Sequence, residues 1–262
     1  MRTFVVAVMM LLAASGTLRA RGLTLTDPAR PALLEGNSYD IAWREDGVGS
    51  VTITASGART PLGGESRGEF EIPIASDVPA SIGGVSWTVP WIDSVTFMLN
   101  LKGYDASGSP IAQDHREYGF RPAVLAGKMA DGIYLDLHEQ THQRLYIELG
   151  GHIVKAYLST SSRNYYWLPP DVHIGIPHDH AGVFHVLGKE PMHWSSLFQV
   201  EMPWALRYLK GHFIHTTSPD QYFALGTPAS SGCNRLTYED AEELYESTPI
   251  GTRVEIIGPN AY

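Results

Sequence analysis

The first half of the chain alternates short apolar or aromatic segments with turn residues. Clusters of Gly, Pro, Asp and Ser separate the segments, and such clusters are typical of turns. Because no helical stretch interrupts the series, the pattern predicts an antiparallel β-sandwich over residues 23–120. The predicted strands include residues 39–43 (YDIAW), 50–55 (SVTITA), 84–90 (GVSWTVP) and 94–105 (SVTFMLNLKGYD).

The alternation restarts after residues 121–127 (RPAVLAG), whose Pro and Gly are typical of a linker. A second, mostly β unit is therefore expected at residues 128–258. Its predicted strands are residues 133–137, 144–149, 152–159, 182–187 and 252–257.

One segment near the C-terminus, Thr237 to Thr248, has the period of a helix instead. Thr237 is followed three residues later by Asp240, which approximates a capping box and predicts that the helix begins here. The side chains expected on its apolar stripe are Tyr238, Ala241, Leu244 and Tyr245.

The N-terminus has the pattern of a secretory signal peptide. One cation, Arg2, precedes an eleven-residue apolar run from Phe4 to Ala14, and small residues follow. A helix that spans a bilayer needs about 20 apolar residues, so this run is too short for an ordinary transmembrane helix. We expect residues 1–20 to direct secretion, and an uncleaved N-terminal anchor is the alternative.

Charge and cysteine content narrow the function classes. The formal net charge is −9 and Lys and Arg form no run, so the clustered cations that bind phosphate backbones are missing and nucleic acid is not expected as a partner. Cys233 is the single cysteine. In an oxidising compartment a lone thiol is either buried and inert or kept for its reactivity, and composition alone favours burial.

The sequence HEQTH, residues 138–142, matches the zinc-peptidase pattern of two histidines four apart with an intervening Glu. That chemistry requires a helix, because only there do the two imidazoles converge on one ion. HEQTH lies between two predicted strands, so we expect His138 to Gln143 to form a hairpin turn. Structural or substrate-facing roles, with a metal site as the alternative, are expected for His173, His178, His180 and His185.

Cys233 has surroundings that suit a nucleophile. It follows Gly232, which lets the backbone bend closely, in a Ser-rich turn just before the predicted helix. Loop amides and a helix N-terminus would stabilise a thiolate and an oxyanion there. Upstream, His215 follows Phe213 and Ile214, as at the end of a strand. A cysteine with a histidine that accepts its proton is the minimal unit for acyl transfer.

These residues resemble the signature of the L,D-transpeptidases with a YkuD-type catalytic domain. That family has an Ile-His pair and, further on, Ser/Thr-His-Gly-Cys, an apolar residue and Asn or Arg; this chain offers Ile214-His215 and residues 230–235 (SSGCNR). The likeness covers about residues 130–258. The first half, through YDIAW, V-x-I and W-x-VP, is loosely similar to Ig-like modules of secreted cell-surface proteins.

The family resemblance implies a role for each matching residue. Cys233 would be the nucleophile, His215 the general base and acid, and the Thr216 backbone carbonyl would orient the imidazole. Backbone amides of Gly232 and Cys233 would form the oxyanion hole. Arg235 would hold the donor's stem peptide or stabilise the loop. Further substrate-binding positions would be Ser230, Ser231, Asn234 and Met202.

Two departures from the family pattern concern the surroundings of Cys233. Ser231 stands where the family usually has His, so substrate choice or the nucleophile's pKa could differ. Asn164 to His180 replaces a compact connection of the family. The side chains that would form an altered lid, or simply pack on the cleft, are Tyr165, Tyr166, Trp167 and His178.

The resemblance implies acyl transfer between peptidoglycan stem peptides through a cysteine thioester, with no metal or organic cofactor, in the periplasm or cell wall. The same residues would serve an L,D-carboxypeptidase or another stem-peptide hydrolase. A wall-binding protein that has lost catalysis is a further alternative, for which Ser231 is the only indication. The Ig-like part would contact the wall or a cell-envelope protein, or act as a passive spacer.

Overall fold

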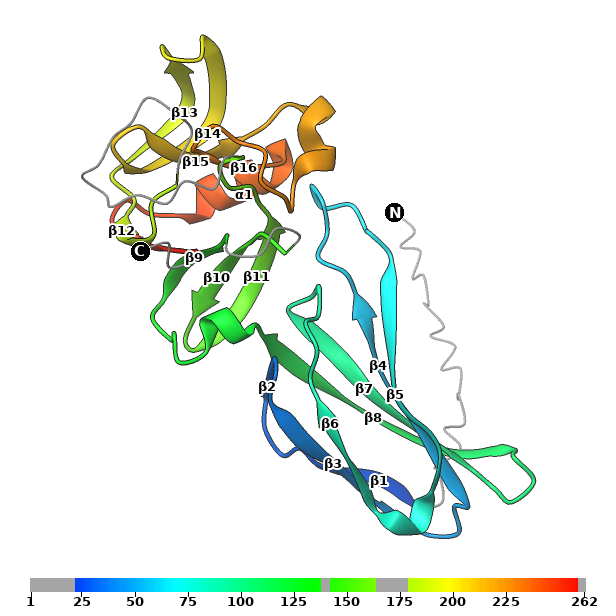
Figure 1. The fold of residues 1–262 in the computed structure, drawn as a ribbon. Coiled ribbons are helices and arrows are strands. Elements are labelled where there is room, and N and C mark those ends of the chain that lie inside the picture. The colour runs from blue at the N-terminus through cyan, green and yellow to red at the C-terminus, as the bar shows by residue number, and fades with distance from the viewer. Residues whose placement is uncertain (1–21, 138–141, 164–178, 259–262) are drawn as a thin grey trace, which may run out of the picture.

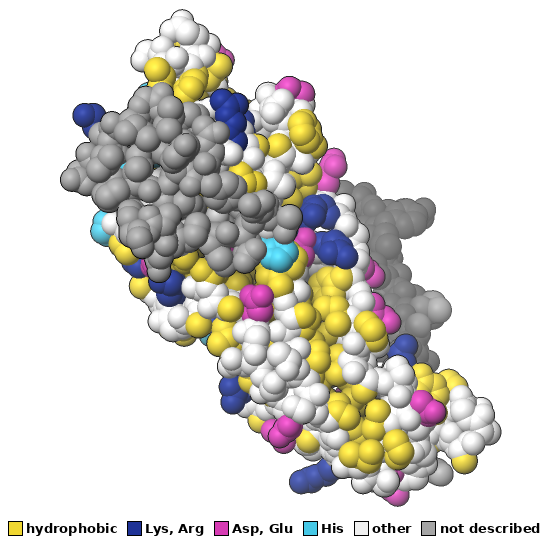
Figure 2. Space-filling view, in the orientation of Figure 1, with side chains coloured by type: hydrophobic (Ala, Val, Ile, Leu, Met, Phe, Trp, Pro, Cys, Tyr) yellow, Lys and Arg dark blue, Asp and Glu magenta, His cyan; other side chains and the backbone are white. Residues whose placement is uncertain are grey.

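The computed structural model describes residues 22–137, 142–163 and 179–258. Two β-rich halves follow one another along the chain (Figure 1). Acidic and basic side chains are interspersed over the face shown in Figure 2. The predicted signal peptide lies outside the described residues. Within the described ranges, no helix is long and apolar enough to cross a membrane.

Two sheets form the N-terminal half, and we call them the N-terminal sandwich. The first is three-stranded, with β3 (Ser38–Glu45) between β1 (Leu23–Asp27) and β6 (Gly84–Thr88). The second has the order β2-β8-β7-β4-β5. Its strands are β2 (Ala32–Leu34), β8 (Pro110–Arg121), β7 (Thr96–Tyr104), β4 (Ser50–Ala58) and β5 (Glu69–Pro79). The mainly β architecture predicted from the alternation is confirmed.

Both sheets of the N-terminal sandwich contribute to one core. Trp43 and Trp87 from the first sheet pack in the same cluster as Phe97 and Tyr118 from the second, and the Trp87 and Phe97 rings meet edge-on at 5.9 Å. Alternate residues of β4 are fully buried, as expected of a strand that has one face against a core. Four predicted segments correspond to β3, β4, β6 and β7.

One strand pair in the N-terminal sandwich differs from the all-antiparallel prediction. β2 runs parallel to β8, with Leu33 opposite Phe120. The reason is that alternation marks which residues of a strand are buried but carries no information on the direction of its neighbour. The prediction was therefore wrong for this pair.

The C-terminal half has two further sheets. The first has the order β11-β10-β9-β17-β12, and the second β13-β14-β15-β16. The strands of the first are β9 (Gly132–Asp136), β10 (Arg144–Leu149), β11 (His152–Leu158), β12 (Gly182–His185) and β17 (Arg253–Ile257). Those of the second are β13 (Gly188–Ser195), β14 (Val200–Leu209), β15 (His212–Thr216) and β16 (Asn234–Leu236).

The predicted helix is confirmed as α1 (Tyr238–Ser247), the one α-helix among the described residues. Thr237 is its N-cap and accepts a hydrogen bond from the Asp240 amide at 3.1 Å. Ala241 and Leu244 are buried in the core between the two C-terminal sheets, as predicted. Tyr238 differs, because it lies in the first turn and stays 43% exposed. Short 3-10 segments are η1 (Ala80–Ile82), η2 (Ala123–Leu125) and η3 (Pro219–Ala224).

The hairpin predicted around HEQTH is confirmed by its two strands. β9 and β10 are antiparallel neighbours, with Asp136 opposite Arg144. Residues 138–141 lie outside the described residues. His142 is described, and its ring stacks flat on Trp91 of the N-terminal sandwich, 3.8 Å between centroids. The surroundings of His142 are therefore those of a packing residue.

Candidate active site

Cys233 and His215 lie on the same face of the β13-β14-β15-β16 sheet. β15 and β16 run parallel, with His215 opposite Arg235, and Cys233 directly precedes β16. Phe213 and His215 are two residues apart on β15, so their side chains share a face, and Cys233 packs against Phe213. His215 is on a strand, as predicted. The short strand β16, which the sequence did not indicate, separates Cys233 from α1.

The loop that carries Cys233 is fixed to the chain that follows β11. The Ser161 carbonyl accepts hydrogen bonds from the Ala229 amide at 3.1 Å and the Ser230 amide at 3.0 Å. At the start of the loop the Gly226 amide donates to the Ser159 carbonyl at 2.7 Å. Each of these partners lies in a buried stretch, so the loop is held at both ends.

Two residues predicted to contact substrate instead make hydrogen bonds within the protein, in or next to this loop. Asn234 is fully buried; its side chain accepts from the Tyr208 hydroxyl at 2.9 Å and donates to the Thr160 carbonyl at 3.0 Å. Ser230 is 2% exposed, and its hydroxyl accepts from the Gly232 amide at 3.1 Å. Substrate contact by either side chain would require it to leave these partners, and it stays a prediction.

Of the other residues predicted to contact substrate, one stabilises the loop and the others lie near Cys233. Arg235 donates to the Ala229 carbonyl and, at 3.4 Å, to the Thr217 hydroxyl, which is the loop-stabilising alternative. Met202 is buried beside Cys233, whereas Ser231 is half-buried. Gly232 has φ of 125°, a conformation that favours glycine, as predicted for the turn. Its amide already donates to Ser230, so its role in an oxyanion hole stays a prediction.

Burial makes both partners of the Cys–His pair neutral near neutral pH. Burial lowers the pKa of His215 to about 4, although the backbone of Thr216 opposes this; Arg235 lowers it further. No described group meets hydrogen-bond geometry at the buried Nδ1 of His215, so the orienting role of Thr216 stays a prediction. Burial raises the pKa of the partly exposed Cys233 thiol to about 11. The predicted stabilisation of a thiolate by the loop is thus outweighed by desolvation in this state.

Two titratable residues near the pair were not assigned to the Cys–His site from the sequence. Asp179 is 2% exposed, accepts the Ser162 amide at 2.8 Å, and burial raises its pKa to about 7. His193 on β13 lies over Phe213 with ring centroids 4.4 Å apart, and its Nδ1 is 2.7 Å from Glu190. From the sequence, Asp179, which lies between His178 and His180, was considered only as a metal ligand, and His193 belongs to no motif, so neither was linked to the Cys–His pair.

His180 and His185, two of the histidines considered as metal ligands, have different surroundings. His180 is buried edge-on to His212 at 4.7 Å between centroids, and His185 is exposed on β12. His173, His178 and the predicted lid aromatics, residues 165–167, lie outside the described residues. Among the residues that the structure describes, no group of three His, Cys, Asp or Glu side chains is arranged to hold a metal ion.

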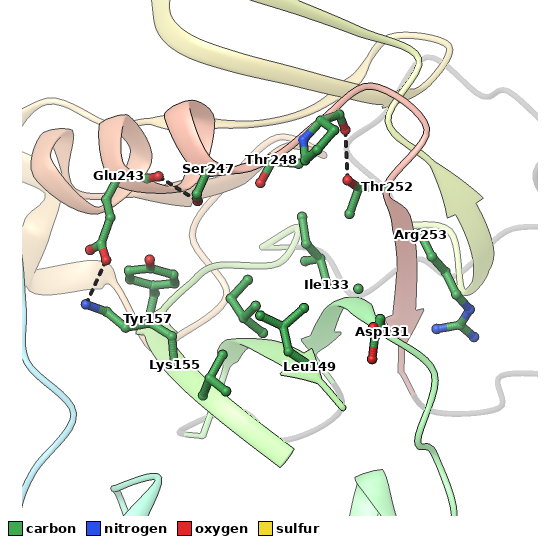
Figure 3. A pocket seen from close by; sticks show the side chains of 14 residues that line it. Asp131, Ile133, Leu149, Lys155, Tyr157, Glu243, Ser247, Thr248, Thr252 and Arg253 are labelled. Atoms are coloured by element: carbon green, nitrogen blue, oxygen red, sulfur yellow. Dashed lines mark hydrogen bonds and ion pairs between the residues drawn. The ribbon is translucent and has the colours of Figure 1, made fainter. Parts of the chain in front are cut away.

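A separate groove of about 580 Å³ lies between α1 and strands β9, β10 and β11 (Figure 3). Its lining is largely apolar and includes Ile147 and Leu149, and Lys155 and Glu243 form a 3.0 Å ion pair at one side. Neither Cys233 nor His215 lines it. The groove is therefore distinct from the candidate active site.

Comparison with known proteins identifies the domain that holds this site. Residues 136–256 match the family described as the YkuD L,D-transpeptidase catalytic domain. No protein with a curated description matches the chain.

Solved structures of L,D-transpeptidases are also similar. That from Stackebrandtia nassauensis is 22% identical (52% of this chain, 61% of that chain, TM-score 0.40). That from Xylanimonas cellulosilytica is 22% identical (50% and 62%, TM-score 0.41), so the chain spans less than two thirds of either. That from Mycobacterium smegmatis is 13% identical (90% and 99%, TM-score 0.37). Residues 136–256, which include both Cys233 and His215, match the L,D-transpeptidase (YkuD) catalytic-domain family.

Proposed function

We propose that the protein is a peptidoglycan L,D-transpeptidase that joins stem peptides through a thioester on Cys233. The observation that carries the proposal is the position of Cys233 and His215 on one sheet face, with a thiol whose pKa is raised and an imidazole whose pKa is lowered. A neutral imidazole is the form that accepts a proton, so at neutral pH His215 is in the protonation state that a general base requires.

In the first half-reaction the sulfur of Cys233 attacks the carbonyl carbon of a diaminoacyl residue in the donor stem, and the thiol proton passes to His215. The tetrahedral intermediate collapses, the amide C–N bond breaks, and the leaving amine takes the proton from His215. The donor remains as a thioester. Splitting one amide exchange into two steps is the gain from covalent catalysis.

In the second half-reaction an amine on an acceptor stem attacks the thioester carbonyl and gives a proton to His215. Collapse forms the new amide and releases the sulfur of Cys233, which recovers the proton. Water in place of the acceptor amine would make the same site an L,D-carboxypeptidase. Neither path needs a redox partner or an activated co-substrate.

Incubation of the purified protein with a disaccharide tetrapeptide, followed by mass analysis, separates the alternatives. Cross-linked dimers are the expected product; tripeptide alone would indicate hydrolysis. Unchanged substrate and no mass adduct on Cys233 would overturn the enzyme assignment and leave a wall-binding protein. His215→Gln should abolish both products, whereas His152→Gln, at an exposed histidine on β11, is the matched control and should keep wild-type rates.

We further propose that the signal-like residues 1–20 direct the chain to the periplasm or cell wall, and that the N-terminal sandwich is an Ig-like module that contacts the wall or an envelope protein. The support is the apolar N-terminal run and the two-sheet architecture of residues 23–120. Mass analysis of the N-terminus of protein from a periplasmic fraction tests the first point. Full-length protein confined to the cytoplasmic fraction would contradict it.

A further inference from the structure

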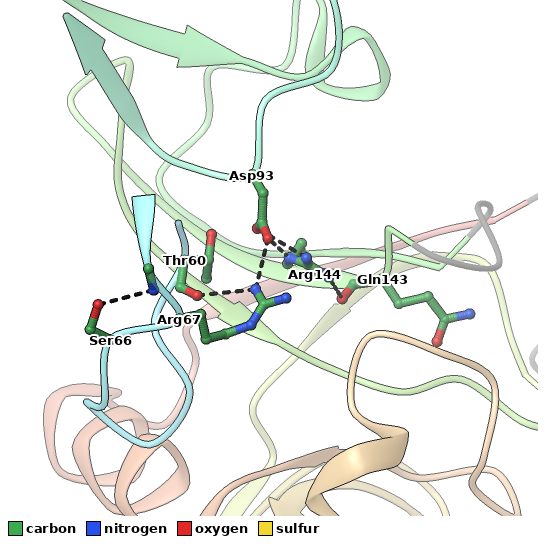
Figure 4. Close-up of polar contacts among 7 residues, drawn as sticks. Thr60, Ser66, Arg67, Asp93, Gln143 and Arg144 are labelled. Carbon is green, nitrogen blue, oxygen red and sulfur yellow. Dashed lines mark hydrogen bonds and ion pairs between the residues drawn. The ribbon is translucent and has the colours of Figure 1, made fainter. Parts of the chain in front are cut away.

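A buried ion pair joins the N-terminal sandwich to the C-terminal half (Figure 4). Asp93, between β6 and β7, accepts hydrogen bonds from Arg144 on β10, at 3.2 Å from Nε and 2.9 Å from Nη2. The side chains of both residues are only 4% exposed. Arg67 donates to the other carboxylate oxygen at 2.7 Å. Burial would raise the pKa of Asp93, but Arg144 and Arg67 outweigh it and hold the pKa below its ordinary value.

The hydrogen bonds continue from this pair to the chain beside the Cys233 loop. Arg144 Nη1 donates to the Gln143 carbonyl at 2.9 Å. The Gln143 side chain then makes two bonds to Ser161: it donates to the hydroxyl at 2.7 Å and accepts from the amide at 2.6 Å. Gln143 and Ser161 are fully buried. The carbonyl of Ser161 is the group that accepts the hydrogen bonds from the Ala229 and Ser230 amides of the Cys233 loop.

Arg144 also packs against the start of the same loop. A Cβ placed on Gly226 would lie 3.2 Å from Arg144 Nη1, so a side chain there would press on the guanidinium. Gly226 has φ of 91°, which adds a backbone reason for glycine. The guanidinium is thus in close contact with the beginning of the loop and, through Gln143 and Ser161, bonded to its end.

The energetics of buried ion pairs indicate what this arrangement is for. A buried pair adds little net stability, because desolvation of two charges offsets their attraction, but loss of one partner leaves an uncompensated charge. Since the pair adds little stability, we assign it the role of holding the Arg144 side chain in one geometry. We propose that Asp93 is a positioning residue for Cys233: it holds Arg144, and through Gln143 and Ser161 it sets the place of the nucleophile's loop. The N-terminal sandwich is then part of the catalytic unit and not a passive spacer; the consequence for turnover rests on the function proposed above.

The reactivity of Cys233 tests this without reference to substrate, because it is the only cysteine. In full-length protein, Asp93→Asn should loosen the loop and expose the thiol. The alkylation rate by iodoacetamide should increase about threefold or more, within the range of coupling between linked sites, and the pH at which the rate reaches half its maximum should fall. A variant that changed only global stability would not move this pH.

Glu148→Gln is the matched control. Arg121 and Glu148 also form an ion pair between β8 and β10, 2.6 Å long with a fully buried carboxylate, but at the end of β10 away from Arg144. Its alkylation rate should equal the wild-type rate even if its urea midpoint falls. Equal alkylation rates in Asp93→Asn and wild type, or equal increases in Asp93→Asn and Glu148→Gln, would overturn the proposal.

A double variant tests the intermediate bonds. Ser161→Ala removes one of the two Gln143 contacts, so it should also increase alkylation, and adding Asp93→Asn should increase it little more if both act along one route. Additive effects on the logarithm of the rate would overturn the shared route. If Asp93→Asn does not fold, Arg67→Gln removes only the more exposed cation, and a smaller increase is expected.

The two hypotheses fail separately. If wild-type protein leaves stem peptides unchanged while the alkylation pattern holds, the proposed reaction is wrong and the positioning role stands. If it cross-links stem peptides but Asp93→Asn keeps the wild-type kcat and alkylation rate, the positioning role is wrong and the reaction stands.

Discussion

The pH dependence of Cys233 alkylation tests the neutral Cys–His pair directly. Burial raises the pKa of Cys233 to about 11, although the Phe213 backbone and Arg235 oppose the increase. The same thiol would ordinarily titrate at 9.0, so its thiolate fraction at about pH 7 is about 100-fold smaller. Only the thiolate reacts with iodoacetamide, so alkylation should be about 100-fold slower than that of a cysteine peptide at this pH.

The assay follows the intact mass of the protein over time at a series of pH values, with Cys233→Ala as the blank. The rate should increase about tenfold per pH unit until the pH approaches the pKa of the thiol. This slope separates ionisation from limited access, because access scales all rates equally. A plateau that begins between about pH 6 and 8 would show a thiolate paired with protonated His215 at neutral pH, and would refute the neutral pair.

Three further predictions concern stability and metals. Burial raises the pKa of Asp179 from 3.8 to about 7 in the folded protein, so the stability that its neutral form contributes is full below pH 3.8 and is lost as pH rises towards 7. Asp179→Asn should therefore raise the urea midpoint more at pH 8 than at pH 5, and equal changes at the two pH values would contradict this. Thr237→Ala should cost about 1 kcal/mol of unfolding free energy through loss of the α1 N-cap, and Thr237→Ser, which keeps the hydroxyl, should cost less. Joint replacement of His138 and His142 by Gln, or addition of chelators, should leave turnover largely intact; loss of turnover with both treatments would revive the zinc hypothesis.

The sequence predicted local features well because each had a local signal. Alternation located strands such as β3 and β7, and Thr237 with Asp240 located the start of α1. Strand direction and neighbours depend on contacts between distant segments, so the parallel pairing of β2 with β8 had no signal in the chain. β16 is too short for a period to be recognised.

In the candidate site, too, the residues with a local sequence signal were predicted and the properties that depend on distant contacts were not. Cys233 and His215 were found from a motif, and the structure places them on one face. Their electrostatics were not predictable, because the pKa of each depends on burial by residues from several elements. Asp93 resembled an ordinary turn residue, and its partner Arg144 lies 51 positions later, a spacing that no local rule recognises.

The position of β17 has a consequence for how the protein is made. Residues 253–257 form an inner strand, parallel to β9 on one side and antiparallel to β12 on the other. The sheet therefore cannot close before residues 253–257 have been synthesised, because its inner position stays empty until then. Strands β9 and β12, made earlier, are joined in this sheet only through β17, so completion of the C-terminal half waits for its last strand.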